Sequence, residues 1–195
     1  MRLLFATGNA GKLREAREIL GPAWDLVSPA QLGVLEEPEE TGASFRENAL
    51  LKARFYAART GLPCFADDSG LEVDALGGAP GIYSARYAGP GHDFEANIDK
   101  LLRELSGCDC RTARFRCAVA LLPRGDEPVF FDGAVEGRIA LGRSGSGGFG
   151  YDPVFLPDAF PGRSLAEVPE EDKNAISHRG VALRKMAAYL LDNPL

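Results

Sequence analysis

The chain has 195 residues, of which 45% are hydrophobic and 26% charged, and its formal net charge is −6. This length and composition predict one globular domain over residues 1–195, with two lobes, and the acidic balance argues against a nucleic-acid partner. No apolar stretch approaches the ~18 residues of a membrane span, and the apolar run near the N-terminus is too short for a signal peptide. We therefore expect a cytoplasmic protein that contacts neither membranes nor nucleic acids.

Hydrophobic periodicity and turn residues predict ten elements. In chain order, strands are expected at 2–6, 24–28, 63–67, 71–75, 111–122 and 128–140, and helices at 10–20, 44–60, 93–105 and 177–191. The helix at 44–60 has the clearest limits, because Ser44 and Glu47 form a capping-box pattern and Gly61 follows its last turn. The last two strands are expected to form an antiparallel hairpin through the turn at 123–128. Helices and strands alternate early and the hairpin follows later, so we expect an α/β protein with a mixed sheet.

The segment "ATGNAGK" (6–12) joins the first predicted strand to the first predicted helix. The amide groups at a helix N-terminus attract anions, and Lys12 adds a full positive charge. The segment is not a P-loop, because Ala6 and Leu13 stand where that motif requires Gly and Ser or Thr. A phosphate site and a simple capped turn both remain open.

Two further segments carry charged residues near predicted element ends. Glu40 precedes the turn into the helix at 44–60, on which Asn48 and Lys52 share one face. Lys52 is either a solvated helix residue or part of a site. Asp67 and Asp68 follow an apolar strand and, if the strand is regular, point to opposite faces. One of them can therefore face a site while the other is structural, although the sequence from Asp67 to Gly70 also favours a turn.

The segment "GRSGSGGFGYDPVF" (142–155) formally contains the glycine pattern of a dinucleotide site. We reject that interpretation because no helix is predicted after it, and we expect a loop that ends at Phe149 and Asp152. Further on, Ser177 is predicted to cap the last helix. This places His178 and Arg179 in its first turn, where cations oppose the helix dipole. An electron-rich ligand would hold such side chains in place.

Taken together, five segments resemble the inosine triphosphate pyrophosphatase family, whose members hydrolyse the non-standard purine nucleoside triphosphates XTP, ITP and dITP. They are TGNAGK (7–12), ETGASFRENALLKA (40–53), ADDSGLEVDALGGAPGIYSARYAG (66–89), GFGYDPVF (148–155) and EEDKNAISHRG (170–180). They extend over nearly the whole chain in the order of the family. The resemblance implies an elongated two-lobed α/β fold around a long mixed sheet with flanking helices, and an active site in the cleft between the lobes. It also implies a Mg²⁺ cofactor, a homodimer, and products that are a monophosphate and pyrophosphate.

The resemblance also implies residue roles. The triphosphate would be bound by Thr7, Gly8, Asn9, Ala10, Gly11 and Lys12, with a looser phosphate contact from Lys52. Glu40 and Asp68 would bind the magnesium ion, Asp68 would also activate the attacking water, and Ser69 would lie against the substrate. Phe149, Gly150, Tyr151, Asp152, Lys173, His178 and Arg179 would bind the base. Whether Asp67 shares the role of Asp68 is open.

A guanidinium group has only hydrogen-bond donors, so Arg179 would accept the 6-oxo group of hypoxanthine or xanthine and disfavour the 6-amino group of adenine. Guanine also has a 6-oxo group, and its rejection needs another residue that the sequence does not identify. Two alternative functions remain open. One is a Maf-type nucleoside triphosphate pyrophosphatase with another base preference, and the other is a nucleotide-binding sensor that does not hydrolyse.

Overall fold

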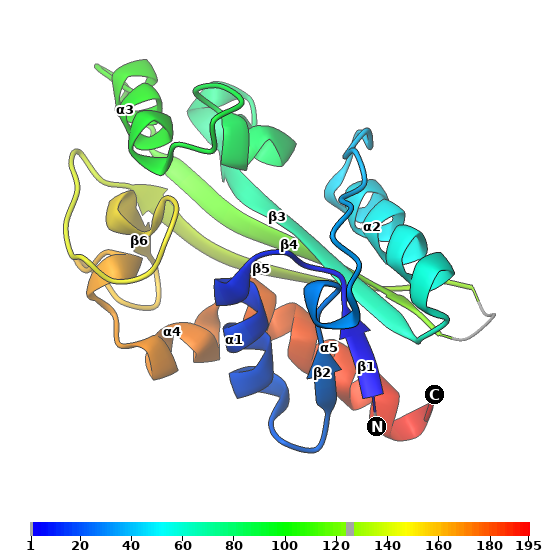
Figure 1. Ribbon diagram of the computed structural model, residues 1–195. Helices are drawn as coiled ribbons and strands as arrows, with labels where there is room; N and C mark the ends of the chain where they lie inside the picture. The colour runs from blue at the N-terminus through cyan, green and yellow to red at the C-terminus, as the bar shows by residue number, and fades with distance from the viewer. Residues whose placement is uncertain (1, 124–126) are drawn as a thin grey trace. The chain divides into compact units, whose positions relative to one another are not determined.

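A computed structural model describes residues 2–123 and 127–195 and has an α/β fold (Figure 1). Its sheet has six strands in the spatial order β2-β1-β3-β4-β5-β6. Strand β1 is parallel to β2 and β3, whereas β6 is antiparallel to β5, which confirms the predicted mixed sheet. The strands are β1 (Arg2–Phe5), β2 (Asp25–Val27), β3 (Cys64–Val73), β4 (Thr112–Leu122), β5 (Val129–Ile139) and β6 (Phe155–Pro157).

The helices agree with the predicted positions except for one addition. They are α1 (Ala10–Leu20), α2 (Phe45–Thr60), α3 (Phe94–Glu104), α4 (Glu170–Ile176) and α5 (His178–Asp192). Helix α2 begins after Ser44, whose hydroxyl accepts a hydrogen bond from the Glu47 amide at 3.2 Å. The Glu47 carboxylate accepts from the Ala43 amide at 2.8 Å, so the cap satisfies amides on both sides of Ser44. Helix α4 and strand β6 were absent from the sequence prediction.

The main correction concerns β3, which is one continuous strand of 10 residues where two strands and a turn were expected. Asp67 and Asp68 therefore lie in the middle of a strand and not at its tip, and the turn interpretation of Asp67 to Gly70 is wrong. Local turn preference gives way here because neighbouring side chains compensate the buried carboxylates. The predicted turn at 123–128 includes residues 124–126, which lie outside the described part of the chain.

The described residues form two compact units. Unit 1 consists of residues 2–68, 117–133 (124–126 not described) and 179–195, and unit 2 of residues 69–116 and 134–178. In the core of unit 1, the rings of Phe5 and Phe65 stack 4.4 Å apart, which packs β1 against β3. In unit 2, the rings of Phe115 and Phe155 pack 4.7 Å apart. Within the described ranges, no helix has the length and apolar character needed to cross a membrane.

Candidate active site

In unit 1, the segment that follows β1 is a capped helix N-terminus. The Asn9 side-chain oxygen accepts hydrogen bonds from the amides of Gly11 (2.8 Å) and Lys12 (3.2 Å), and the Asn9 amide donates to the Thr7 hydroxyl at 3.1 Å. The capped turn considered from the sequence is therefore present. The first turn of α1 contains no acidic residue. The positive end of the α1 dipole is therefore not neutralised by a carboxylate of its own first turn.

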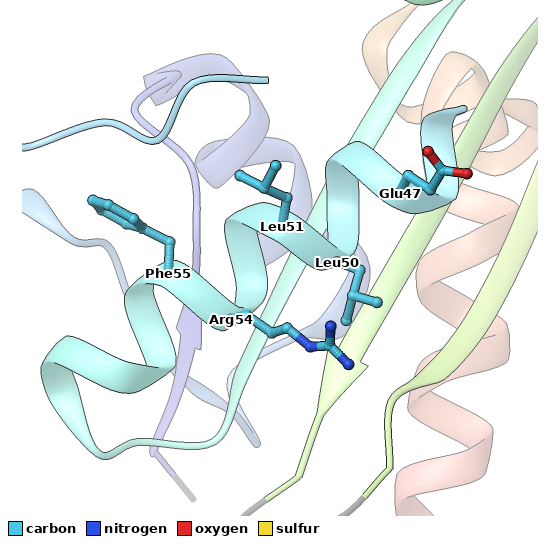
Figure 2. Close-up of a pocket in the computed structure, with 5 residues that line it drawn as sticks. All are labelled: Glu47, Leu50, Leu51, Arg54 and Phe55. Carbon is cyan, nitrogen blue, oxygen red and sulfur yellow. The ribbon is translucent and has the colours of Figure 1, made fainter. Parts of the chain in front are cut away.

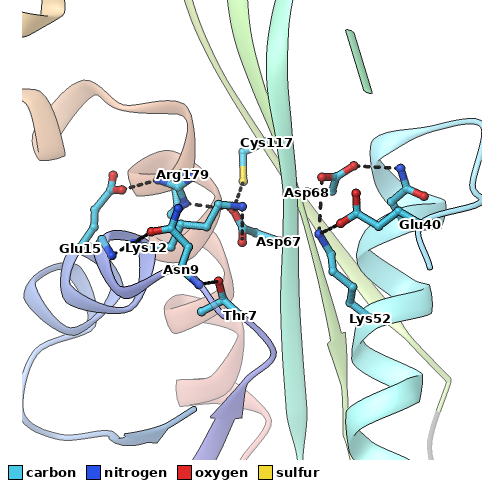
Figure 3. Close-up of polar contacts among 12 residues, drawn as sticks. Thr7, Asn9, Lys12, Glu15, Glu40, Lys52, Asp67, Asp68, Cys117 and Arg179 are labelled. Atoms are coloured by element: carbon cyan, nitrogen blue, oxygen red, sulfur yellow. Dashed lines mark hydrogen bonds and ion pairs between the residues drawn. The ribbon is translucent and has the colours of Figure 1, made fainter. Parts of the chain in front are cut away.

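The Lys12 side chain extends from α1 to the buried carboxylate of Asp67 on β3. Its Nζ lies 3.1 Å from Oδ1 and 3.0 Å from Oδ2 of Asp67. Arg179, at the start of α5, donates from Nε to Asp67 Oδ2 at 3.0 Å and from Nη1 to Glu15 on α1. Figure 3 shows these side chains together on one side of β3. The thiol of Cys117 on β4 also lies 3.9 Å from Asp67 Oδ2.

In this network the two carboxylates and Arg179 are buried, and Lys12 is partly exposed. Asp67 and Arg179 are each 1% exposed. Burial would raise the pKa of Asp67, but the positive charges of Lys12 and Arg179 outweigh it and hold that pKa well below its usual value. Burial would likewise lower the pKa of Arg179, but Asp67 and Glu15 raise it. Asp67 is therefore ionised and fully engaged by cations.

Asp68 points to the opposite face of β3, as the alternation of strand residues requires (Figure 3). Its Oδ2 accepts from Asn48 Nδ2 at 3.1 Å, and its Oδ1 lies 3.5 Å from Lys52 Nζ. Lys52 also donates to Glu40 Oε1 at 2.7 Å. Both Asn48 and Lys52 come from α2, so the shared helix face expected from their spacing is confirmed.

The pair Glu40 and Asp68 is a set of hard oxygen donors around one cation. Burial raises the pKa of Asp68, and the negative charge of Glu40 raises it further, while Lys52 lowers it only in part. Burial would lower the pKa of Lys52, but the carboxylates around it, Asp68 foremost, raise it above the usual value. The Lys52 ammonium thus occupies a position between two carboxylates whose chemistry suits a divalent cation, since Mg²⁺ is commonly bound by one or two carboxylates plus water and phosphate oxygens.

In unit 2, a second cluster is built around Asp152. Its Oδ2 accepts from the Phe149 amide at 3.0 Å and from Lys173 Nζ at 2.7 Å. Lys173 also lies 5.1 Å from the centre of the Phe149 ring, which is 40% exposed. Gly148 has φ +72° and packs against Asp152 so closely that a Cβ would clash with its carboxylate. The cluster therefore presents an aromatic face beside a partly buried ion pair.

Two other predicted base-pocket residues lie inside unit 2. His178 stacks on Phe115 with ring centres 5.0 Å apart and an angle of 13° between the rings. Tyr151 is buried and donates from its hydroxyl to the Ser84 carbonyl at 2.8 Å, and burial raises the pKa of Tyr151. The Tyr151 hydroxyl is thus hydrogen-bonded to the backbone of its own unit.

The structure assigns the predicted site residues to the two units as follows. Unit 1 holds Thr7, Gly8, Asn9, Ala10, Gly11, Lys12, Glu40, Lys52, Asp68 and Arg179, and unit 2 holds Ser69, Phe149, Gly150, Tyr151, Asp152, Lys173 and His178. Sequence reasoning missed the contacts of Glu15, Asn48 and Cys117. Only Asn48 had a usable signal, its position one turn before Lys52.

One pocket lies on the outer face of α2 and is separate from these contacts (Figure 2). Its volume is about 570 Å³, and it is lined by Glu47, Leu50, Leu51, Arg54 and Phe55. None of these residues belongs to the predicted site. The α2 residues that contact the carboxylates, Asn48 and Lys52, are not part of this lining.

The chain is similar to known proteins over nearly its whole length. Residues 3–189 match the model of the Ham1 family. The chain is 53% identical over 189 residues to the dITP/XTP pyrophosphatase of Thioalkalivibrio sulfidiphilus, with 94% of this chain and 95% of the relative covered. It is 48% identical to the dITP/XTP pyrophosphatase of Bacillus subtilis, with 96% of each chain covered.

Solved structures give the same result. The Ham1 protein of Staphylococcus aureus superposes with a TM-score of 0.89 at 40% identity, covering 98% of this chain and 99% of that one. A Mycobacterium abscessus protein described as a nucleoside-triphosphatase / dITP/XTP pyrophosphatase has a TM-score of 0.78 at 45% identity, with 100% of both chains covered. A family model that spans nearly the whole chain, relatives near half identity and a shared fold lead to one conclusion: the chain belongs to the Ham1 family.

Proposed function

We propose that this protein hydrolyses the non-standard purine nucleoside triphosphates dITP, ITP and XTP to the monophosphate and pyrophosphate, and so removes them from the nucleotide pool. The observation that carries the proposal is the convergence of Glu40 and Asp68 on the Lys52 ammonium in unit 1. A protein that only bound nucleotides would not need a carboxylate that activates water, which is the role proposed below for Asp68. Relatives at 48–53% identity that are named dITP/XTP pyrophosphatases support the substrate class.

The phosphates are bound by the N-terminus of α1 and by lysines. The segment Thr7–Lys12 lies at the positive end of the α1 dipole, has no acidic residue in the first turn and carries the Lys12 side chain. Lys12 is 17% exposed at its side chain, whereas Arg179 is 2% exposed, so Lys12 is the cation of the Asp67 network that a nucleotide can reach. Arg179 then keeps Asp67 paired when Lys12 turns to phosphate. Lys52 supplies a second phosphate contact.

Glu40 and Asp68 would hold Mg²⁺. The fit rests on their all-oxygen donor set and on the raised pKa of Asp68, which burial and the nearby charge of Glu40 cause and which an added cation would relieve. When bound, the ion supplies positive charge to the phosphate oxygens.

Asp68 accepts the proton of the attacking water. The water oxygen forms a bond to the α-phosphorus, the bond from that phosphorus to the bridging oxygen breaks, and pyrophosphate leaves. Its Oδ1 is the oxygen that does not accept from Asn48, and a carboxylate oxygen within reach of the water can take up its proton. Asp67 cannot share this role while it is engaged by Lys12 and Arg179, because its pKa is lowered by their charges after burial is overcome.

The base is bound by residues of unit 2. The exposed ring of Phe149 offers a stacking surface, and Lys173 and Asp152 offer a donor and an acceptor beside it. Gly150, Tyr151 and His178 complete the surroundings, and Ser69 lies against the substrate. Contact of Arg179 with the 6-oxo group stays a prediction from the sequence. For this role, the guanidinium must reach the base while it also contacts Asp67 and Glu15.

Homodimer formation and a cytoplasmic location also stay predictions from the resemblance.

Pyrophosphate release measured with Mg²⁺ on ITP, XTP, GTP, ATP and dTTP tests the proposal. We expect ITP and XTP to exceed ATP and dTTP in kcat/KM by at least about 10²-fold. Preference for dTTP would favour the Maf-type alternative. Tight nucleotide binding without turnover would favour the sensor.

A further inference from the structure

Asn48 is a fully buried polar residue in the middle of the unit 1 contacts. It lies on α2 one turn before Lys52 and is 0% exposed. A buried amide must find partners for its oxygen and its nitrogen. Its Oδ1 accepts from the Gly42 amide at 2.8 Å, and its Nδ2 donates to Asp68 Oδ2 at 3.1 Å. One short side chain thereby ties together the segment before α2, the helix itself and strand β3.

The bond to Asp68 distinguishes the two oxygens of that carboxylate. Oδ2 is engaged by Asn48, and Oδ1 is the oxygen that faces Lys52 at 3.5 Å. Lys52 in turn contacts Glu40 at 2.7 Å. Asn48 therefore fixes the rotation of the Asp68 carboxylate, and with it the oxygen directed at the proposed site of reaction.

The bond to Gly42 fixes the segment that carries Glu40. Gly42 packs against the first turns of α2 with no space for a side chain, because a Cβ there would lie 2.6 Å from Asn48 Oδ1 and 2.9 Å from the Asn48 amide nitrogen. Glu40 lies two residues earlier in the chain. The same amide side chain thus anchors both carboxylates, one through each end of its amide group.

We infer that Asn48 is a positioning residue for the hydrolysis reaction: it holds Asp68 with Oδ1 directed at the reacting water and holds the segment that presents Glu40. The inference rests on the proposed function. Asn48 itself does not contact the substrate and acts through Asp68 and Gly42. Misplacement of a reacting group by about 1 Å can lower a rate about 10²-fold, which sets the size of the expected effect.

Two variants separate the two bonds. Asn48→Asp keeps an oxygen that accepts from Gly42 but loses the donor to Asp68, and Asn48→Leu has similar volume and loses both bonds. The matched control is Tyr56→Phe, which removes a hydrogen bond of 3.0 Å from the same helix to the Glu36 carbonyl and touches neither Asp68 nor Glu40. All three are assayed for pyrophosphate release from ITP with Mg²⁺ at pH 7 and at pH 9, because only the ionised form of the new carboxyl lacks a donor for Asp68.

We expect kcat to fall about 10²-fold in both Asn48 variants, while KM for ITP changes less than about threefold. Calorimetric binding of ITP without a divalent cation should also stay within about threefold, and Tyr56→Phe should keep kcat within about twofold of the parent protein. If Asn48→Leu does not fold, which its thermal unfolding curve reveals, Asn48→Asp alone carries the test.

Three results would overturn the inference. Normal kcat in Asn48→Asp would show that the Asp68 bond does not orient the reaction. Parallel loss of kcat and ITP binding would indicate general damage to the fold, and an equal loss of kcat in Tyr56→Phe would indicate that any change in α2 has this effect. Failure of the proposed function is a separate result, because the parent protein itself would then release no pyrophosphate from ITP, and the role of Asn48 would fall with it.

Discussion

Replacement of Arg179 by alanine tests whether its guanidinium maintains unit 1. Its Nε contacts Asp67 and its Nη1 contacts Glu15, and all three side chains are almost completely buried. Arg179→Ala removes a positive charge that compensates two buried carboxylates. Lys12 stays beside Asp67 at 3.0 Å, so Asp67 loses only part of its compensation.

The size of the effect follows from burial. Removal of one partner from a buried ion pair typically costs about 3–5 kcal/mol, because the remaining charge is left in a poorly solvated position. Solvent hardly screens the interaction between Arg179 and Asp67, because their side chains are only 1–2% exposed. Since the free energy of unfolding of a domain is about 5–15 kcal/mol, we expect Arg179→Ala to lose a large share of its stability.

Urea unfolding at pH 7, followed by circular dichroism, measures this loss. The matched control is Arg59→Ala, which removes an ion pair with Glu36, whose side chains are 39% and 74% exposed, and a contact with the Phe55 ring at 3.4 Å. These exposed contacts together should cost about 1 kcal/mol. Glu15→Gln removes one of the carboxylates that Arg179 compensates. The double variant Glu15→Gln/Arg179→Ala should therefore lose less than the sum of the single variants, by about 1–3 kcal/mol.

A loss below about 1 kcal/mol in Arg179→Ala, equal to that of the Arg59 control, would refute this reasoning. Strict additivity with Glu15→Gln would refute the claim that the two side chains stabilise each other. Both outcomes would mean that water or neighbouring groups compensate the carboxylates without the guanidinium.

Three further predictions concern the reaction. Asp68→Asn should abolish pyrophosphate release from ITP while calorimetric nucleotide binding stays largely intact, and turnover at the parent rate would contradict the assignment of Asp68. Lys12→Ala should raise KM with kcat nearly unchanged, because Lys12 meets phosphates in both the ground and transition states; a fall in kcat alone would instead place Lys12 at the leaving pyrophosphate. If Arg179 also reads the 6-oxo group, Arg179→Ala should lower the ITP/ATP ratio of kcat/KM about 10–150-fold, and a ratio unchanged within twofold would leave Arg179 with its role in unit 1 alone.

The sequence was sufficient to predict features that depend only on residues close together in the chain. Ser44 and Gly61 mark the limits of α2, and the alternation of strand side chains correctly separated Asp67 from Asp68. Helix α4 (Glu170–Ile176) was missed although its first turn contains three acidic residues, which favour a helix N-terminus. Its seven residues are too few for a periodic pattern to appear.

The continuity of β3 could not be predicted in this way. The residues from Asp67 to Gly70 favour a turn locally, and a buried carboxylate in mid-strand is unfavourable without compensation. The compensating groups, Lys12 and Arg179, lie 55 and 112 residues away from Asp67 in the sequence. A pattern of neighbouring residues cannot predict contacts between residues so far apart in the sequence. For the same reason, no sequence pattern indicates the contact of Arg179 with Glu15.

The pairing of β3 with β1 makes the number of residues between Phe65 and Asp68 a structural requirement. Leu4 and Phe5 pair with Cys64 and Phe65, and this register decides which face each following residue occupies. Deletion of a single residue between Phe65 and Asp67 would place Asp68 beside Lys12 and leave a serine hydroxyl opposite Lys52. The number of residues between Phe65 and the two aspartates is therefore as strict a requirement as the aspartates themselves. Grafting of this strand into another protein must preserve that number.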